Sequence, residues 1–68
     1  MLHETAILDV YDLEEARLSA KAFGCTGLLW APAGPTGHPL IQFVGEPAAL
    51  RDLLDAMGFE DEGTTRAF

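Results

Sequence analysis

The spacing of apolar residues along this chain predicts three β-strands. Residues 5–11 are rich in β-forming side chains and place an apolar residue at every second position, which is the period of a strand. Residues 26–31 and 40–44 are short apolar runs with glycine or proline at their borders, as expected for two further strands. The segment 32–39 between them is dense in turn-forming residues and is expected to be a projecting loop.

Two helices are predicted from capping residues and from apolar residues at helical spacing. Asp12 and Glu15 have the spacing of a capping box, so the first helix is expected to begin directly after Asp12. Gly24 can adopt the left-handed conformation that ends it. The second helix is expected to begin with Pro47 at its first position and to end at Gly58. Its apolar residues recur at i, i+3, i+4 and i+7, and they are Leu50, Leu53, Leu54 and Met57.

The predicted order of elements is strand, helix, strand, strand, helix, which is typical of an α+β fold. A right-handed crossover between the first two strands leaves room for the third between them, antiparallel to both. We therefore expect a small ferredoxin-like βαββα domain with a three-stranded antiparallel sheet, in order 1-3-2, and two helices on one face. Residues 1–59 should form this single domain, and residues 60–68 a frayed acidic C-terminal tail or a short edge strand.

Two helices can cover only one face of such a sheet, although each predicted strand has apolar residues on both faces. Leu28 and Trp30 share one face of the second strand, and Tyr11 lies opposite Leu8 on the first. One set of apolar side chains is therefore expected to lack cover, and to contact a second copy, another protein or the C-terminal tail. Alternatively, Trp30 and its neighbours are ordinary core residues.

Charge is distributed unevenly along the chain. Residues 24–45 contain no Asp, Glu, Lys or Arg, which predicts that they build the core or a contact surface. The 68 residues carry 11 acidic and 4 basic side chains, a formal net charge of −7, which disfavours direct binding to nucleic acid or anionic lipid. Arg51 is the only base in residues 46–62, and it is expected to pair with Asp55. The acids of that segment are Glu46, Asp52, Asp55, Glu60, Asp61 and Glu62.

The sequence contains no recognised catalytic or metal-binding pattern. Cys25 and His38 are expected near opposite ends of the second strand, with Cys25 as a small buried side chain and His38 exposed in the loop. Together with His3 they match no known spacing of zinc ligands. Asp9 and Asp12 are close in sequence, but so small a domain is not expected to form a cleft for acid–base chemistry. We therefore expect no enzyme activity, no cofactor and no metal.

Other features indicate a cytoplasmic protein. Cys25 has no second cysteine to pair with inside the chain, which is typical of a reducing compartment or of an inert buried thiol. The N-terminus lacks the positive start and apolar run of a secretion signal. Prolines and glycines interrupt the uncharged segment long before the roughly 20 apolar residues that a membrane-spanning helix needs.

We expect from these features a non-catalytic, acidic protein-interaction module. The carboxylates of residues 46–62 would mimic a phosphate backbone and bind a basic, nucleic-acid-binding surface of a partner protein. Tyr11 and Trp30 complete the predicted partner-binding residues. In size and charge the chain resembles the nucleic-acid-mimicking inhibitors that phages deploy against host defence complexes, anti-CRISPR proteins among them, which implies an inhibitor. The resemblance covers no specific residues.

Two other interpretations remain at this stage. A dimeric regulatory domain could pair through the open sheet face and bind a small metabolite, as ferredoxin-like sensor domains do. Gly34, Thr36 and Gly37 of the loop would line its metabolite site. The plainest interpretation of the acidic surface is solubility.

Overall fold

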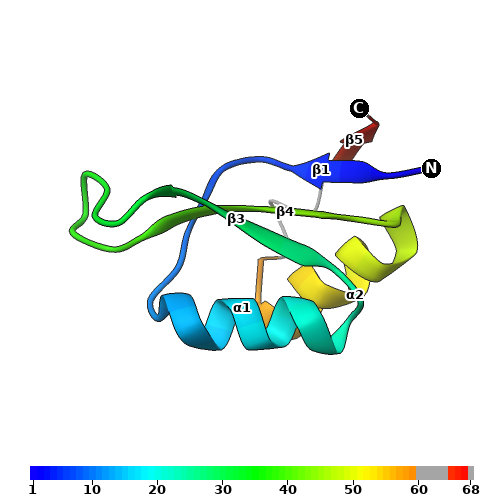
Figure 1. Cartoon of the computed structure of the whole chain (residues 1–68), viewed down its shortest axis with the longest axis horizontal. Coiled ribbons are helices and arrows are strands. Elements are labelled where there is room, and N and C mark those ends of the chain that lie inside the picture. The colour runs from blue at the N-terminus through cyan, green and yellow to red at the C-terminus, as the bar shows by residue number, and fades with distance from the viewer. Residues whose placement is uncertain (60–64, 68) are drawn as a thin grey trace.

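The computed structural model describes residues 1–59 and 65–67. In chain order the elements are β1 (His3–Thr5), β2 (Leu8–Asp9), α1 (Leu13–Ala22), β3 (Thr26–Ala31), β4 (Leu40–Gly45), α2 (Pro47–Met57) and β5 (Thr65–Ala67). The α+β class expected from the sequence is confirmed (Figure 1). Expectations about residues 60–64 and 68 lie outside the described residues.

Strand β4 is the centre of an antiparallel sheet. One of its edges pairs with β3, and the other pairs with β1 and then with β2. Strand β1 also pairs with β5, so the described part of the sheet extends beyond β1. The expectation of three strands is wrong, because β5 takes a further position in the sheet.

The prediction of one continuous strand over residues 5–11 is also wrong, because the structure has two short strands, β1 and β2, in this region. At Thr5, hydrogen bonds that involve side chains replace the backbone hydrogen bonds between the strand and β4. The Phe43 amide donates to Thr5 Oγ1 at 3.1 Å, and Gln42 Nε2 donates to the Thr5 carbonyl at 2.8 Å. Ala6 and Ile7 leave the sheet, and pairing with β4 resumes at Leu8. The interruption divides the strand into β1 and β2.

Both helices begin and end where their capping residues predict. Asp12 Oδ1 accepts a hydrogen bond from the Glu15 amide at 3.2 Å, and Pro47 occupies the first turn of α2. Gly24 and Gly58 have φ values of 76° and 84°, the left-handed conformation that favours glycine. After Gly58, the Phe59 amide donates to the Leu54 carbonyl at 2.9 Å. This bond belongs to a Schellman end, as the sequence predicted.

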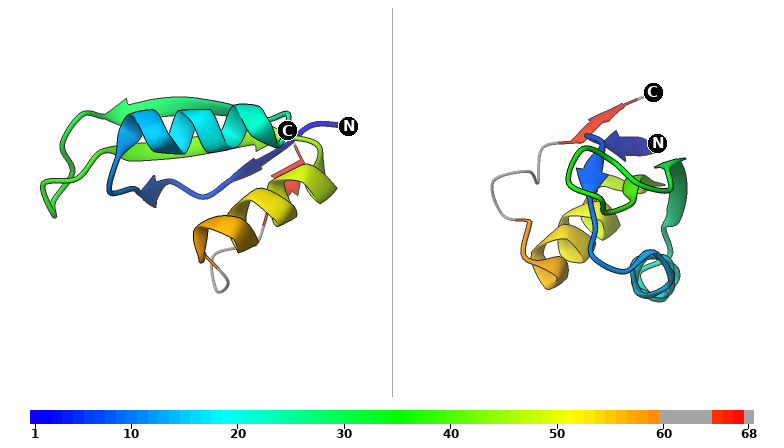
Figure 2. Two further views of the ribbon diagram at one scale, coloured as in Figure 1. Left: turned by 90° about the horizontal axis from the view of Figure 1, so that it is seen from below. Right: turned by 90° about the vertical axis from the view of Figure 1, so that its left-hand side faces the viewer.

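Helices α1 and α2 lie on the same face of the sheet, and the core fills the space between the two layers (Figures 1 and 2). The uncharged segment 24–45 was expected to build the core, which is only partly correct. Ile41 and Phe43 of β4 are fully buried, whereas β3 is exposed along most of its length because only β4 pairs with it among the described strands. The other buried apolar residues are Leu8, Val10, Ala16, Ala20, Cys25, Leu50, Leu53 and Leu54.

Candidate protein-interaction surfaces

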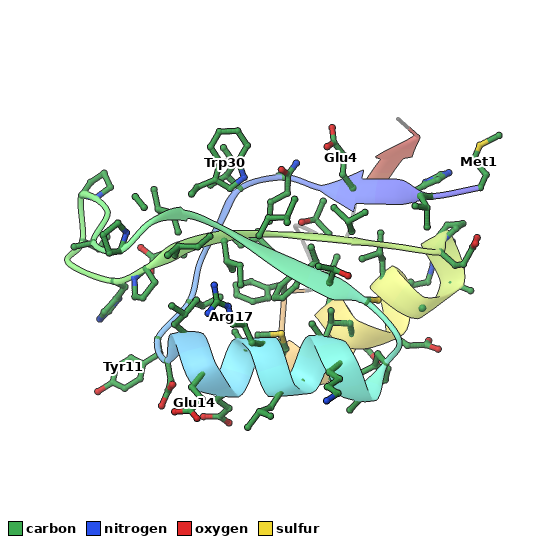
Figure 3. All side chains as sticks on the ribbon, viewed as in Figure 1. Met1, Glu4, Tyr11, Glu14, Arg17 and Trp30 are labelled. Carbon is green, nitrogen blue, oxygen red and sulfur yellow. The ribbon has the colours of Figure 1, made fainter. Side chains whose placement is uncertain are left out.

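The sheet face opposite the helices carries Trp30. Its side chain is 58% exposed, and it points away from both helices, as does Glu4 (Figure 3). The indole Nε1 donates to Gln42 Oε1 at 3.0 Å, and Leu28, the ladder partner of Gln42, is also exposed on this face. Leu28 and Trp30 therefore form an exposed apolar patch that neither helix covers.

Tyr11 lies on the other side of the molecule from Trp30. It lies just before Asp12, the N-cap of α1, is 87% exposed, and points away from the sheet (Figure 3). Its ring centroid lies 5.2 Å from that of His38. The structure therefore does not bring together the two aromatic residues that the sequence analysis assigned to partner binding.

The loop before β4 is held by Asp9 of β2. His38 Nδ1 lies 3.3 Å from Asp9 Oδ1, and the Thr36 hydroxyl donates to Asp9 Oδ2. The Gly34 amide donates to the His38 carbonyl at 2.7 Å, so the loop also bonds to itself. The expectation that His38 is an exposed loop residue is correct in part, because its side chain lies in the loop and is 44% exposed but also contacts Asp9 and Tyr11.

The acids around α2 point into solvent. Glu46 is exposed and accepts from the N-terminal ammonium at 3.3 Å, and Asp52 and Asp55 are exposed on the helix. The expected ion pair between Arg51 and Asp55 is not formed. The base precedes the acid here, which is the less favourable order along a helix. Glu60, Asp61 and Glu62 lie outside the described residues.

A groove of about 440 Å³ separates the first half of α1 from the end of α2. Three carboxylates line it, those of Asp9, Asp12 and Glu15, and none of the lining side chains in residues 1–59 is basic. The remaining lining residues are Val10, Tyr11, Ala16, Ser19, Ala56, Met57 and Phe59. From the sequence, so small a domain was not expected to form a cleft for acid–base chemistry; the groove is a surface depression, and its geometry does not test that expectation. The acids at every third position from Asp9 to Glu15 were the available signal.

Cys25 is buried beside β4. Its Sγ donates to the Phe23 carbonyl at 3.7 Å, and desolvation by burial raises the pKa of the thiol. Cys25 lies next to Gly45, while His38 lies at the other end of the β3–β4 pair, so the two side chains are not neighbours. No group of three or more His, Cys, Asp or Glu residues that could hold a metal ion occurs within residues 1–59 and 65–67.

Comparison with protein-family models, with curated proteins and with solved structures gives no match to this chain. Neither α1 nor α2, the two helices of the described residues, has the length and apolar character needed to cross a membrane.

Proposed function

We propose that this chain is a non-catalytic interaction module that binds a basic surface of a partner protein. The observation that carries the proposal is that the carboxylates of both helices are exposed and not neutralised internally. Arg17, Lys21 and Arg51 lie on the same helices, but none of them forms an ion pair with a described acid. The exposed acids without such a pair are Asp12, Glu14, Glu15, Asp52 and Asp55.

Unpaired carboxylates on a rigid helix can replace the phosphates of a nucleic acid in contacts with lysine and arginine. Together with the size of the chain and its net charge of −7, this supports the role of a nucleic-acid-mimicking inhibitor like the anti-CRISPR proteins. We further propose that β1, α1, β3, β4 and α2 form a ferredoxin-like unit with β4 between β1 and β3. The cytoplasm, where Cys25 stays reduced, is the proposed location.

The proposed function is tested by capturing partners from host lysate on immobilised protein at low ionic strength. A captured protein should be released by salt and by competing double-stranded DNA, because exposed ion pairs are screened. An affinity unchanged between low and high salt, or capture that nucleic acid does not reverse, contradicts mimicry.

Substitutions on α2 make the same test specific to the carboxylates. Reversing charge at Asp52 and Asp55 to lysine should abolish capture, and neutralising both to asparagine should weaken it. A matched control for the asparagine variant is Thr26→Lys with Ala33→Lys. Like that variant it raises the net charge by 2, but at exposed positions outside α2. Equal loss in the asparagine variant and in the control would show that only net charge matters.

A second candidate function is a dimeric regulatory domain, and the exposed patch of Leu28 and Trp30 favours it. A stable dimer in light scattering that Trp30→Arg dissociates would support this candidate. A shift of the melting temperature on adding amino acids or nucleotides would support a metabolite site in the 32–39 loop. In that loop the hydroxyl of Thr36 is already bonded to Asp9.

A further inference from the structure

We infer that the groove between α1 and α2 binds a basic peptide segment of the partner that carries one large apolar side chain. This inference rests on the proposed function and adds the site and the form of the ligand. It extends the contact from the outer side of α2, where the sequence placed it, into the space between the helices.

The apolar part of the groove supplies the anchor site. Val10 and Ala16 are buried at its base, while Met57 and Phe59 are only half-buried and present apolar surface. Its volume of about 440 Å³ is within the usual range of ligand pockets, and because the groove is open to solvent on one side it can accept one side chain of an extended segment. Methionine and aromatic side chains also adapt well to an inserted apolar group.

The charges of the lining define the rest of the ligand. Asp12 and Glu15 supply two exposed carboxylates, and Asp9, which also contacts Thr36 and His38, supplies a third. No basic side chain lines the groove among the residues whose side chains are described. These acids are not grouped so that they could hold one metal ion, as no such group occurs in the described part of the chain. Carboxylates that are too dispersed for a single cation suit cations distributed along a peptide. The exposed ring of Tyr11 adds a face on which an arginine or lysine can stack.

Other occupants have the wrong charge. A second copy of the chain is strongly negative, since each copy carries a formal charge of −7. Nucleic acid is also strongly negative because of its phosphates. The residues that follow Phe59 in the sequence, Glu60, Asp61 and Glu62, have the same sign as the acids of the groove. A basic segment of another protein is the occupant with complementary charge.

The test uses three synthetic peptides and the full ¹⁵N-labelled chain at low ionic strength. The first peptide alternates arginine and lysine around one tryptophan, the second has serine in place of tryptophan, and the third has glutamate in place of the bases. We expect the first peptide to bind and to shift the amide signals of Glu15, Ser19 and Met57. The second should bind about tenfold more weakly and the third not at all.

Two substitutions on α2 then locate the binding site. Ala56 lines the groove and Ala48 does not, and both are exposed. Ala56→Arg should therefore weaken binding of the first peptide about tenfold, while Ala48→Arg, with the same added charge, should change it less than twofold. Equal effects of the two variants, equal affinity for the first two peptides, or no binding of any peptide would overturn the inference.

The same variants separate this inference from the proposed function. Capture of a salt-sensitive partner that is abolished by reversing Asp52 and Asp55 but unaffected by Ala56→Arg would leave the function and overturn the groove. Peptide binding that follows the predicted pattern, without any captured partner that nucleic acid displaces, would support the groove and contradict nucleic-acid mimicry.

Discussion

Gly45 at the end of β4 packs directly against Cys25, since a Cβ added to Gly45 would lie 2.8 Å from the Cys25 Sγ and 3.4 Å from its Cα. Gly45→Ala should therefore lower the free energy of unfolding by about 1–3 kcal/mol, the usual cost of overpacking a core. In the Cys25→Ala background the same change should cost less, because the sulfur is gone. Chemical denaturation of the four proteins measures this coupling, and additive losses would contradict it.

Gln42 connects two parts of the sheet, accepting from Trp30 and donating to the Thr5 carbonyl. Gln42→Leu should lower the free energy of unfolding by about 1–3 kcal/mol, because it leaves the buried Thr5 carbonyl without this donor. Trp30→Phe removes only the contact at the exposed indole, where water can substitute, and should cost less than about 1 kcal/mol. Denaturant titration compares the two variants, and equal losses would show that the Thr5 bond is unimportant.

Asp12 is both the cap of α1 and a member of the groove. Asp12→Ala should lower the free energy of unfolding by about 1 kcal/mol, whereas Asp12→Asn keeps a capping oxygen and should cost little. Hydrogen exchange at the Glu15 amide, which donates to Asp12, should accelerate only in the alanine variant. Unchanged exchange there would mean that the cap does not hold the first turn.

Burial of Cys25 predicts a loss of stability in alkaline solution. Its pKa is raised in the folded protein, so the unfolded chain releases the thiol proton at a lower pH than the folded one. This contribution is complete below the ordinary thiol pKa of 9.0 and is lost as pH rises through the folded value. Urea titrations from pH 8 to 10.5 should show a decline that is smaller in Cys25→Ala, and identical declines would remove thiol burial as its cause.

The helices were predictable because their signals are local. Asp12 caps an amide three residues away, Pro47 occupies a first turn, and Gly24 and Gly58 take the left-handed conformation at the ends. None of these features depends on a distant part of the chain. The expected Arg51–Asp55 pair failed although it is also local, because two exposed side chains gain little from pairing.

The first strand was not predictable from alternation. It is interrupted because Thr5 bonds to Gln42 and Phe43, which are 37 and 38 residues away. As a result Ile7, which the period of two assigns to a strand, lies between β1 and β2 and outside the ladder. A periodic pattern does not show where a side chain will replace a ladder hydrogen bond.

The candidate binding site was only partly predictable. Exposed acids on α2 follow from helical spacing, and Asp52 and Asp55 lie where that spacing places them. The groove combines residues from the segment before α1, from α1 itself and from the end of α2. Its existence depends on the packing of two helices that are far apart in sequence, which no local pattern encodes.

Strand β5 pairs with β1 in a register that sets Ala67 against His3, so early and late parts of the chain are neighbours in the sheet. On the ribosome β1 is made before β5, and among the described strands only β5 pairs with the outer edge of β1, so this pair forms after Thr65 to Ala67 have emerged from the exit tunnel. Closing so long a loop is slow, because entropy must be lost before any contact forms. A nascent chain stalled before Thr65 would therefore present an unpaired strand edge to other chains.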